Sequence, residues 1–187
     1  MKKLSALMLA LVMLLSFAAA EGAVATINFT EMLPADQLAL GTFDTLTEDM
    51  PVKVWVPNDT FAVADLSTLP DEFVSDLTIG AFKYLADESK VIYFNLLPND
   101  EGAFADLVAA LKADTETFRN VDEAIVNGYH SVSYKVPEED GTITALATYE
   151  IKPEMYLNIM FKTTENEADA MFNQLASLIA ASVSPAE

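Results

Sequence analysis

Residues 121–162 read VDEAIVNGYHSVSYKVPEEDGTITALATYEIKPEMYLNIMFK, and this stretch decides the fold. Apolar and polar side chains alternate through it, as they do in strands that turn one face to a core. The alternation predicts four strands, at Val121–Val126, Tyr129–Val136, Thr142–Ile151 and Met155–Lys162. Between the first two lies Asn127-Gly128, a pair that tolerates the positive φ angles of a type I′ hairpin turn. Short turns between successive strands indicate an antiparallel meander.

The residues before this stretch carry further strand signals. Pro51–Val56 alternates, with Val52, Val54 and Val56 on one side. Leu77–Leu85 and Lys90–Leu97 read as a hairpin, and Gly80 within it indicates a bulge or a close backbone approach. The pattern is weakest in residues 21–50, where two strands are expected, at Val24–Phe29 and Leu38–Leu46.

Two segments have helical periodicity. In the first, Phe104, Leu107, Val108 and Leu111 follow the i, i+3, i+4, i+7 spacing, and the helix should end near Asp114. The second should begin at Thr164-Glu165-Asn166-Glu167, a capping-box pattern, and continue as an apolar stripe to Pro185. We therefore expect an α+β fold: a mostly antiparallel sheet of six or seven strands with two main helices, arranged as an α/β/α sandwich.

The order of elements resembles the PsbP-like family, which includes the Mog proteins. Three segments carry the resemblance: Val56-Pro57-Asn58 after an early strand, the Asn127-Gly128 turn leading to Ser131–Tyr134, and the final helix over Leu175–Ser182. It spans roughly Thr42 to Val183 and concerns layout, so it implies a fold and transfers no functional residue.

The first twenty residues have the pattern of a secretory signal peptide. Met1-Lys2-Lys3 precedes an apolar run, and Ala18-Ala19-Ala20 is a small-residue exit before Glu21. A retained membrane anchor is the alternative, but the apolar stretch is shorter than the roughly 20 residues a spanning helix needs. We expect residues 1–20 to be removed and residues 21–187 to form a single domain, secreted from a bacterium. The chain has no cysteine, so a lipid anchor and disulfides are excluded.

Charge limits the classes of partner. The formal net charge is −19, and loss of Lys2 and Lys3 would make it −21. Such a surface repels nucleic acid and anionic membranes, which both require basic faces. It suits basic partners or cations, although acidity without a specific partner would look the same.

Catalytic motifs are missing from the sequence. His130 is the single histidine, no Gly-x-Ser-x-Gly elbow accompanies it, and neither a glycine-rich phosphate loop nor another cofactor motif is present. Two alternatives rest on acidic residues. A hydrolase would use a carboxylate pair in a cleft, from Glu48-Asp49, Asp71-Glu72, Asp100-Glu101 or Glu138-Glu139-Asp140. A calcium-dependent accessory module would bind the ion through Glu138, Glu139 and Asp140.

The favoured hypothesis is a secreted, non-catalytic binding domain without a cofactor, for a protein partner or small ligand that the sequence does not identify. Four residues are candidates for the contact. Trp55 would form the floor of a pocket if its side of the strand is open, and would be core if a helix covers it. Arg119 is the lone arginine and so a candidate anion contact, while Tyr129 and His130 follow the hairpin turn as a recognition edge.

Overall fold

The computed structural model describes residues 24–46, 52–98, 103–153 and 155–186. It confirms the four strands of the meander as β7 (Arg119–Val126), β8 (Tyr129–Pro137), β9 (Ile143–Lys152) and β10 (Met155–Thr163). Asn127 and Gly128 both have positive φ, 49° and 92°, as a type I′ turn requires. The predicted signal peptide lies outside the described residues.

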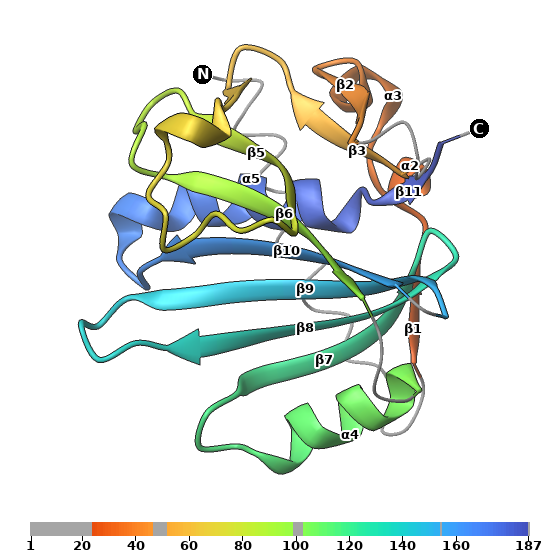
Figure 1. The fold of residues 1–187 in the computed structure, drawn as a ribbon. Helices are drawn as coiled ribbons and strands as arrows, with labels where there is room; N and C mark the ends of the chain where they lie inside the picture. Colours follow the sequence, from red (N-terminus) through yellow and green to blue (C-terminus); the bar gives the residue numbers. More distant parts are fainter. Residues whose placement is uncertain (1–23, 47–51, 99–102, 154, 187) are drawn as a thin grey trace.

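The meander is the middle of an eight-stranded sheet with the order β1-β7-β8-β9-β10-β6-β5-β4 (Figure 1). The other members are β1 (Ala25–Ile27), β4 (Phe61–Val63), β5 (Thr78–Tyr84) and β6 (Val91–Pro98). The sheet is larger than the six or seven strands predicted. It is also mixed, because β1 pairs with β7 in parallel. A shift in the pairing of β5 with β6 at Thr78/Gly80 confirms a bulge at Gly80.

A second, three-stranded sheet has the order β11-β3-β2. It contains β2 (Gly41–Thr45), β3 (Val52–Pro57) and β11 (Ser184–Pro185). The predicted strand over Leu38–Leu46 is thus shorter, because α3 (Ala35–Leu38) occupies its beginning. The predicted strand over Val24–Phe29 likewise ends early, where α2 (Phe29–Met32) begins.

The two main helices are α4 (Phe104–Ala113) and α5 (Ala170–Ala181). The prediction for the second helix was wrong at its start: a 3₁₀ turn over Glu167–Asp169 precedes α5, and Asn166 before it makes no side-chain cap. Another 3₁₀ turn spans Leu66–Thr68. In the described part of the chain, no helix combines the length and apolarity needed to cross a membrane.

The eight-stranded sheet is covered on both faces (Figure 1). On what we call the α5 face, α5 packs between the large sheet and β3. That core contains Phe94, Leu157, Ile159, Phe172 and Trp55 among others. On the opposite α4 face, two smaller clusters lie apart: α4 packs on Val132 and Tyr156, and the segment 64–74 packs on Tyr93 and Ala81.

Candidate binding surface

The α4 face has an incompletely covered part between its two clusters. The pairing register places Tyr134 of β8 beside Leu146 of β9, Leu146 beside Met160 of β10, and Met160 beside Tyr93 of β6. Tyr134, Leu146 and Met160 are all half-buried, as are Thr144 and Lys162 in the neighbouring row. We call these five residues the open strip. Tyr134 and Met160 pack against the edges of the two clusters, and the exposed parts of the adjacent apolar side chains are available for contact with another surface.

A small hollow lies at the β6 end of the open strip. Its volume is about 90 Å³. The lining side chains are Phe73, Ser89, Val91, Tyr93, Thr144, Met160 and Lys162. Small-molecule sites usually measure roughly 300–1,000 Å³, so this hollow fits one side chain or a group of similar size.

Lys162 and Asp140 form the polar rim of the hollow. The Lys162 ammonium lies 3.2 Å from the Asp140 carboxylate and 6.0 Å from the centre of the Phe73 ring. Asp140 also accepts hydrogen bonds from the Thr142 hydroxyl and the Thr142 backbone N–H, at 2.5 and 2.9 Å. These bonds, together with Lys162, lower the pKa of Asp140 to about 2. The Asp140 carboxylate is therefore ionised at neutral pH and faces the Lys162 ammonium.

Polar side chains, three of them buried and Asn95 half-buried, form the row next to the strip. Thr148, Asn158, Asn95 and Thr78 follow one another across β9, β10, β6 and β5. Asn158 Nδ2 donates to Thr148 Oγ1 at 2.9 Å, and Thr78 Oγ1 donates to Asn95 Oδ1 at 2.8 Å. Buried polar groups are tolerated when they are paired in this way. The pairs fix the strands beneath the strip, and sequence reasoning missed them because the register between strands is not visible in the sequence.

The acidic turn does not gather ligands for a cation. The Thr144 hydroxyl donates to Glu138 at 2.7 Å, Glu139 is exposed, and Asp140 faces Lys162. A calcium ion here would lie beside an ammonium group, which opposes its binding. Within the described ranges, no group of three or more His, Asp or Glu side chains is placed to hold a metal ion.

Trp55 belongs to the core, so it does not form the floor of an open pocket. Its side chain is 1% exposed and its ring lies 5.7 Å from that of Phe29. The indole Nε1–H donates to the Leu38 carbonyl at 2.9 Å, and the backbone N–H donates to Ser182 Oγ at 2.7 Å. The structure thus realises the alternative in which Trp55 is covered, although β3 is buried between layers rather than beneath a single helix.

The other three candidate residues do not converge. Tyr129 and His130 are consecutive in β8, so their side chains point to opposite faces of the sheet. Tyr129 packs against the core of the α5 face, whereas His130 is exposed with its ring 6.4 Å from that of Phe104. Arg119 is exposed at the start of β7, opposite Lys135.

Carboxylates with displaced pKa values are all displaced in one direction. The pKa values of Asp65, Asp87, Asp114, Asp140 and Asp169 are lowered, chiefly by hydrogen bonds from nearby side chains or backbone N–H groups. A general acid requires the opposite displacement. The pair Asp71 and Glu72 is exposed, and the pairs Glu48-Asp49 and Asp100-Glu101 lie outside the described residues. None of the five carboxylates with lowered pKa values is therefore prepared for acid catalysis.

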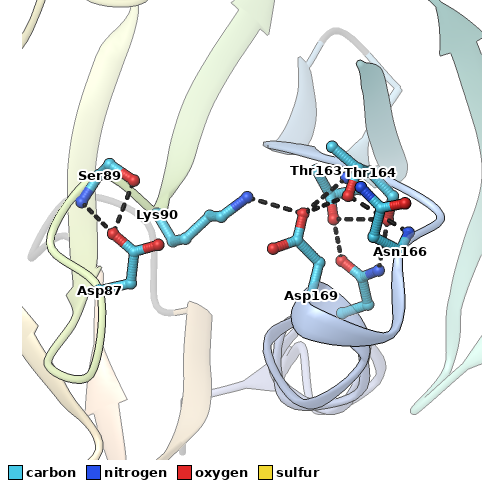
Figure 2. Close-up of polar contacts among 8 residues, drawn as sticks. Asp87, Ser89, Lys90, Thr163, Thr164, Asn166 and Asp169 are labelled. Carbon is cyan, nitrogen blue, oxygen red and sulfur yellow. Dashed lines mark hydrogen bonds and ion pairs between the residues drawn. The ribbon is translucent and has the colours of Figure 1, made fainter. Parts of the chain in front are cut away.

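A polar network joins the β5–β6 hairpin to the start of α5 (Figure 2). The Lys90 ammonium lies 2.8 Å from the Asp169 carboxylate, and these side chains are 18% and 12% exposed. Asp169 also accepts hydrogen bonds from the backbone N–H and hydroxyl of Thr164, at 2.9 and 2.7 Å. Lys90 and Thr164 together lower the pKa of Asp169. These contacts bind α5 to the hairpin, so we assign the network to stability.

Comparison with known proteins bears on the fold. No protein-family model matches the chain, and no curated protein is similar to it in sequence. Among solved structures, cyanobacterial PsbP (CyanoP) from Synechocystis sp. PCC 6803 superposes with a TM-score of 0.52 at 12% identity, over 81% of this chain and 95% of that one. The fold is PsbP-like.

Two weaker similarities accompany this one. LpqN of Mycobacterium tuberculosis, described as involved in cell envelope biogenesis, has a TM-score of 0.49 at 16% identity, over 79% of this chain and 91% of that one. A Bacteroides thetaiotaomicron protein has a TM-score of 0.48 at 7% identity, over 73% of this chain and 46% of that one. At these identities, similarity to CyanoP establishes the PsbP-like fold and leaves the function to be argued from the surface.

Proposed function

We propose that the protein is a non-catalytic binding domain that acts outside the cytoplasm and contacts a protein partner through the open strip. The observation that carries the proposal is the row Tyr134–Leu146–Met160, whose side chains are only half-buried between the two covered parts of the sheet face. Aromatic and Met side chains are enriched at protein interfaces, while charged side chains are depleted at their centres. The charged pair Lys162–Asp140 lies at the edge of this row, where an interface rim would be.

The size of the hollow supports a protein partner over a small ligand. A space of about 90 Å³ holds a single inserted side chain, whereas a cofactor-sized molecule requires several times that volume. The formal net charge of −19 adds a preference for a partner with a basic surface. The leader pattern of residues 1–20 supports the location outside the cytoplasm.

The test combines crosslinking with substitution in cells of the producing organism. A photo-reactive residue in place of Thr144 should capture one partner, and Leu146→Glu should reduce the yield of that product at least tenfold, about 1.4 kcal/mol of binding. Leu77→Glu is the matched control, because Leu77 is 40% exposed and lies outside the strip. Equal capture by wild type, Leu146→Glu and Leu77→Glu would contradict the proposal.

A further inference from the structure

Among the described residues, the large sheet ends at β4, an edge strand whose outer side has no neighbouring strand. The Ala64 N–H donates to the Ala81 carbonyl and the Leu85 N–H to the Thr60 carbonyl, both at 2.9 Å. Hydrogen-bonded and non-bonded pairs alternate in an antiparallel ladder, so Ala62 bonds with Lys83, whereas the backbone groups of Phe61 and Val63 point away from β5. Among the residues that the structure describes, none forms a hydrogen bond with these outward groups.

This edge also carries the most exposed apolar side chains of the described chain. Val63 is 78% exposed and Leu85, opposite Thr60, is 51% exposed. Proteins usually protect an edge strand by keeping it very short, or with lysine, proline, a bulge or a covering element. β4 is short, with three residues, but it contains neither lysine nor proline, and its pairing with β5 is regular. The edge thus offers both backbone groups and an apolar contact to another strand.

The charges around β4 determine which kind of added strand the edge would attract. Asp59 and Asp65 flank it and are exposed, while Lys83 on β5 is the neighbouring cation. If a second copy paired antiparallel with β4, Asp59 of one copy would approach Asp65 of the other. Two chains of net charge −19 would add to that repulsion. An extended segment with basic residues at its ends would be attracted by both carboxylates.

We propose that the β4 edge binds an extended basic peptide segment by strand addition. The peptide would bond with the outward N–H and C=O groups of Phe61 and Val63, and would place one apolar side chain against Val63. Asp59 lies in the turn before β4 and Asp65 lies two residues after it, so the two carboxylates flank the strand at its opposite ends. Basic residues at both ends of the peptide would be attracted to them. This surface is separate from the open strip.

The first test uses a designed probe with the isotope-labelled protein produced from its full-length chain. The probe is a seven-residue peptide with blocked ends, lysine at both terminal positions, and alternating threonine and valine between them. Its binding should shift the amide resonances of residues 59–65 and slow hydrogen exchange at the Phe61 and Val63 amides. A matched peptide with glutamate in place of lysine should bind at least tenfold more weakly at low salt. Equal binding of both peptides, or no slowing at these two amides, would overturn the proposal.

Substitutions at Val63 distinguish binding through backbone hydrogen bonds from non-specific association of the peptide. Val63→Pro removes an N–H that points away from β5, so the native ladder should survive while probe affinity falls at least tenfold. Val63→Thr keeps the N–H and should retain affinity within about threefold. If Val63→Pro does not fold, Val63→Lys should block the basic probe by charge repulsion.

Two further controls complete the design. The double variant Asp59→Asn/Asp65→Asn should lose about fivefold in affinity at low salt and show weaker salt dependence. Asparagine suits Asp59, whose φ is 57°. Leu146→Glu should bind the probe like wild type, which separates this result from that of the open strip. Unchanged affinity in Val63→Pro, or a concentration-dependent dimer that this substitution abolishes, would overturn the peptide proposal.

Discussion

Asn127 occupies the hairpin turn and also connects distant segments through its side chain. Its side-chain carbonyl accepts a hydrogen bond from the Phe29 N–H at 2.7 Å. Its Nδ2 donates to the Val183 carbonyl at 2.7 Å and to the Ala181 carbonyl at 3.2 Å. The residue that reverses the chain between β7 and β8 thus also connects the start of α2 with the end of α5. Only an amide at this position supplies both an acceptor and two donors.

Asn127→Ala should lower the free energy of unfolding by about 2–4 kcal/mol, because three side-chain hydrogen bonds are lost and alanine disfavours positive φ. Asn120→Ala is the matched control. Asn120 also has a positive φ, 52°, but it is exposed and its side chain makes no hydrogen bond with another described residue. The control should cost only about 1 kcal/mol. Urea denaturation of both variants measures the difference, and equal losses would show that Asn127 acts through its backbone alone.

Asp169 makes stability depend on pH at the acidic end. Its pKa is lowered in the folded protein, first by Lys90 and then by Thr164. Its contribution is therefore present above the unfolded value of 3.8 and is lost as pH falls below it. Asp169→Asn should be less stable than wild type at pH 7, by about 1 kcal/mol. Denaturation at pH 7 and pH 2.5 should show this difference shrinking, and a difference independent of pH would contradict the assignment.

At the scale of elements, predictability follows the length of the alternating pattern. The meander strands were predicted to within two residues at each end, because each has at least six residues and a turn signal at its limits. A strand was predicted over Val24–Phe29, but β1 has only three residues, too few to fix its ends or its parallel pairing with β7. The separate small sheet was missed because β3 is buried on both sides, and alternation does not reveal which sheet a strand joins.

The candidate surface was less predictable, because alternation within one strand does not show which other element packs on it. Alternation along β8 puts Tyr134 and Val132 on one face, and the structure has both in the cluster under α4. Which of them is covered depends on where α4 sits, and that follows from tertiary packing. Trp55 is covered where the sequence left its exposure open. Its ring contacts Phe29, which comes from a region where the sequence pattern is weak. Thr164 also differs from its predicted role, because its hydroxyl bonds with Asp169 instead of capping a helix that begins there.

The contact between β2 and β3 provides a prediction at this scale. A Cβ on Gly41 would collide with the Trp55 ring and would lie 2.5 Å from the Val56 carbonyl oxygen. Gly41→Ala should therefore destabilise the protein by about 1–3 kcal/mol through overpacking. Gly80→Ala is the control, because a Cβ there meets nothing within 4 Å. Thermal denaturation should show a lower Tm for the first variant and little change for the second. Similar Tm values for the two variants would contradict the close approach seen here.

At the scale of the whole molecule, the two faces of the large sheet differ in how completely they are covered. The α5 face is closed by α5 and the small sheet, and there the Tyr149 hydroxyl donates to the Ala180 carbonyl at 2.7 Å within the core. The α4 face is covered in two places and leaves the open strip between them. Binding at the strip or at the β4 edge would leave the closed core unchanged. A partner should therefore bind with little change in the backbone.

The net charge predicts how the whole fold responds to salt. With 10 basic and 29 acidic residues, repulsion within the compact state opposes folding. The screening length falls from about 30 Å at 0.01 M salt to about 10 Å at 0.1 M, so added salt should weaken this repulsion. It should also weaken the ion pairs of the described residues, but the two exposed pairs contribute at most about 1 kcal/mol each, and the more buried pair Lys90–Asp169 is screened less. We expect Tm to rise by about 3–6 °C between these salt concentrations.

The same measurement examines the calcium alternative. Because the Asp140 carboxylate faces Lys162, calcium should act only as a screening ion. At 5 mM, calcium chloride and magnesium chloride should then raise Tm equally, since both salts supply the same ionic strength. A specific site would stabilise the folded state further, in proportion to the logarithm of calcium concentration over its Kd. A Tm in calcium that exceeds the Tm in magnesium, and that Asp140→Asn brings back to the magnesium value, would restore the acidic turn as a calcium site.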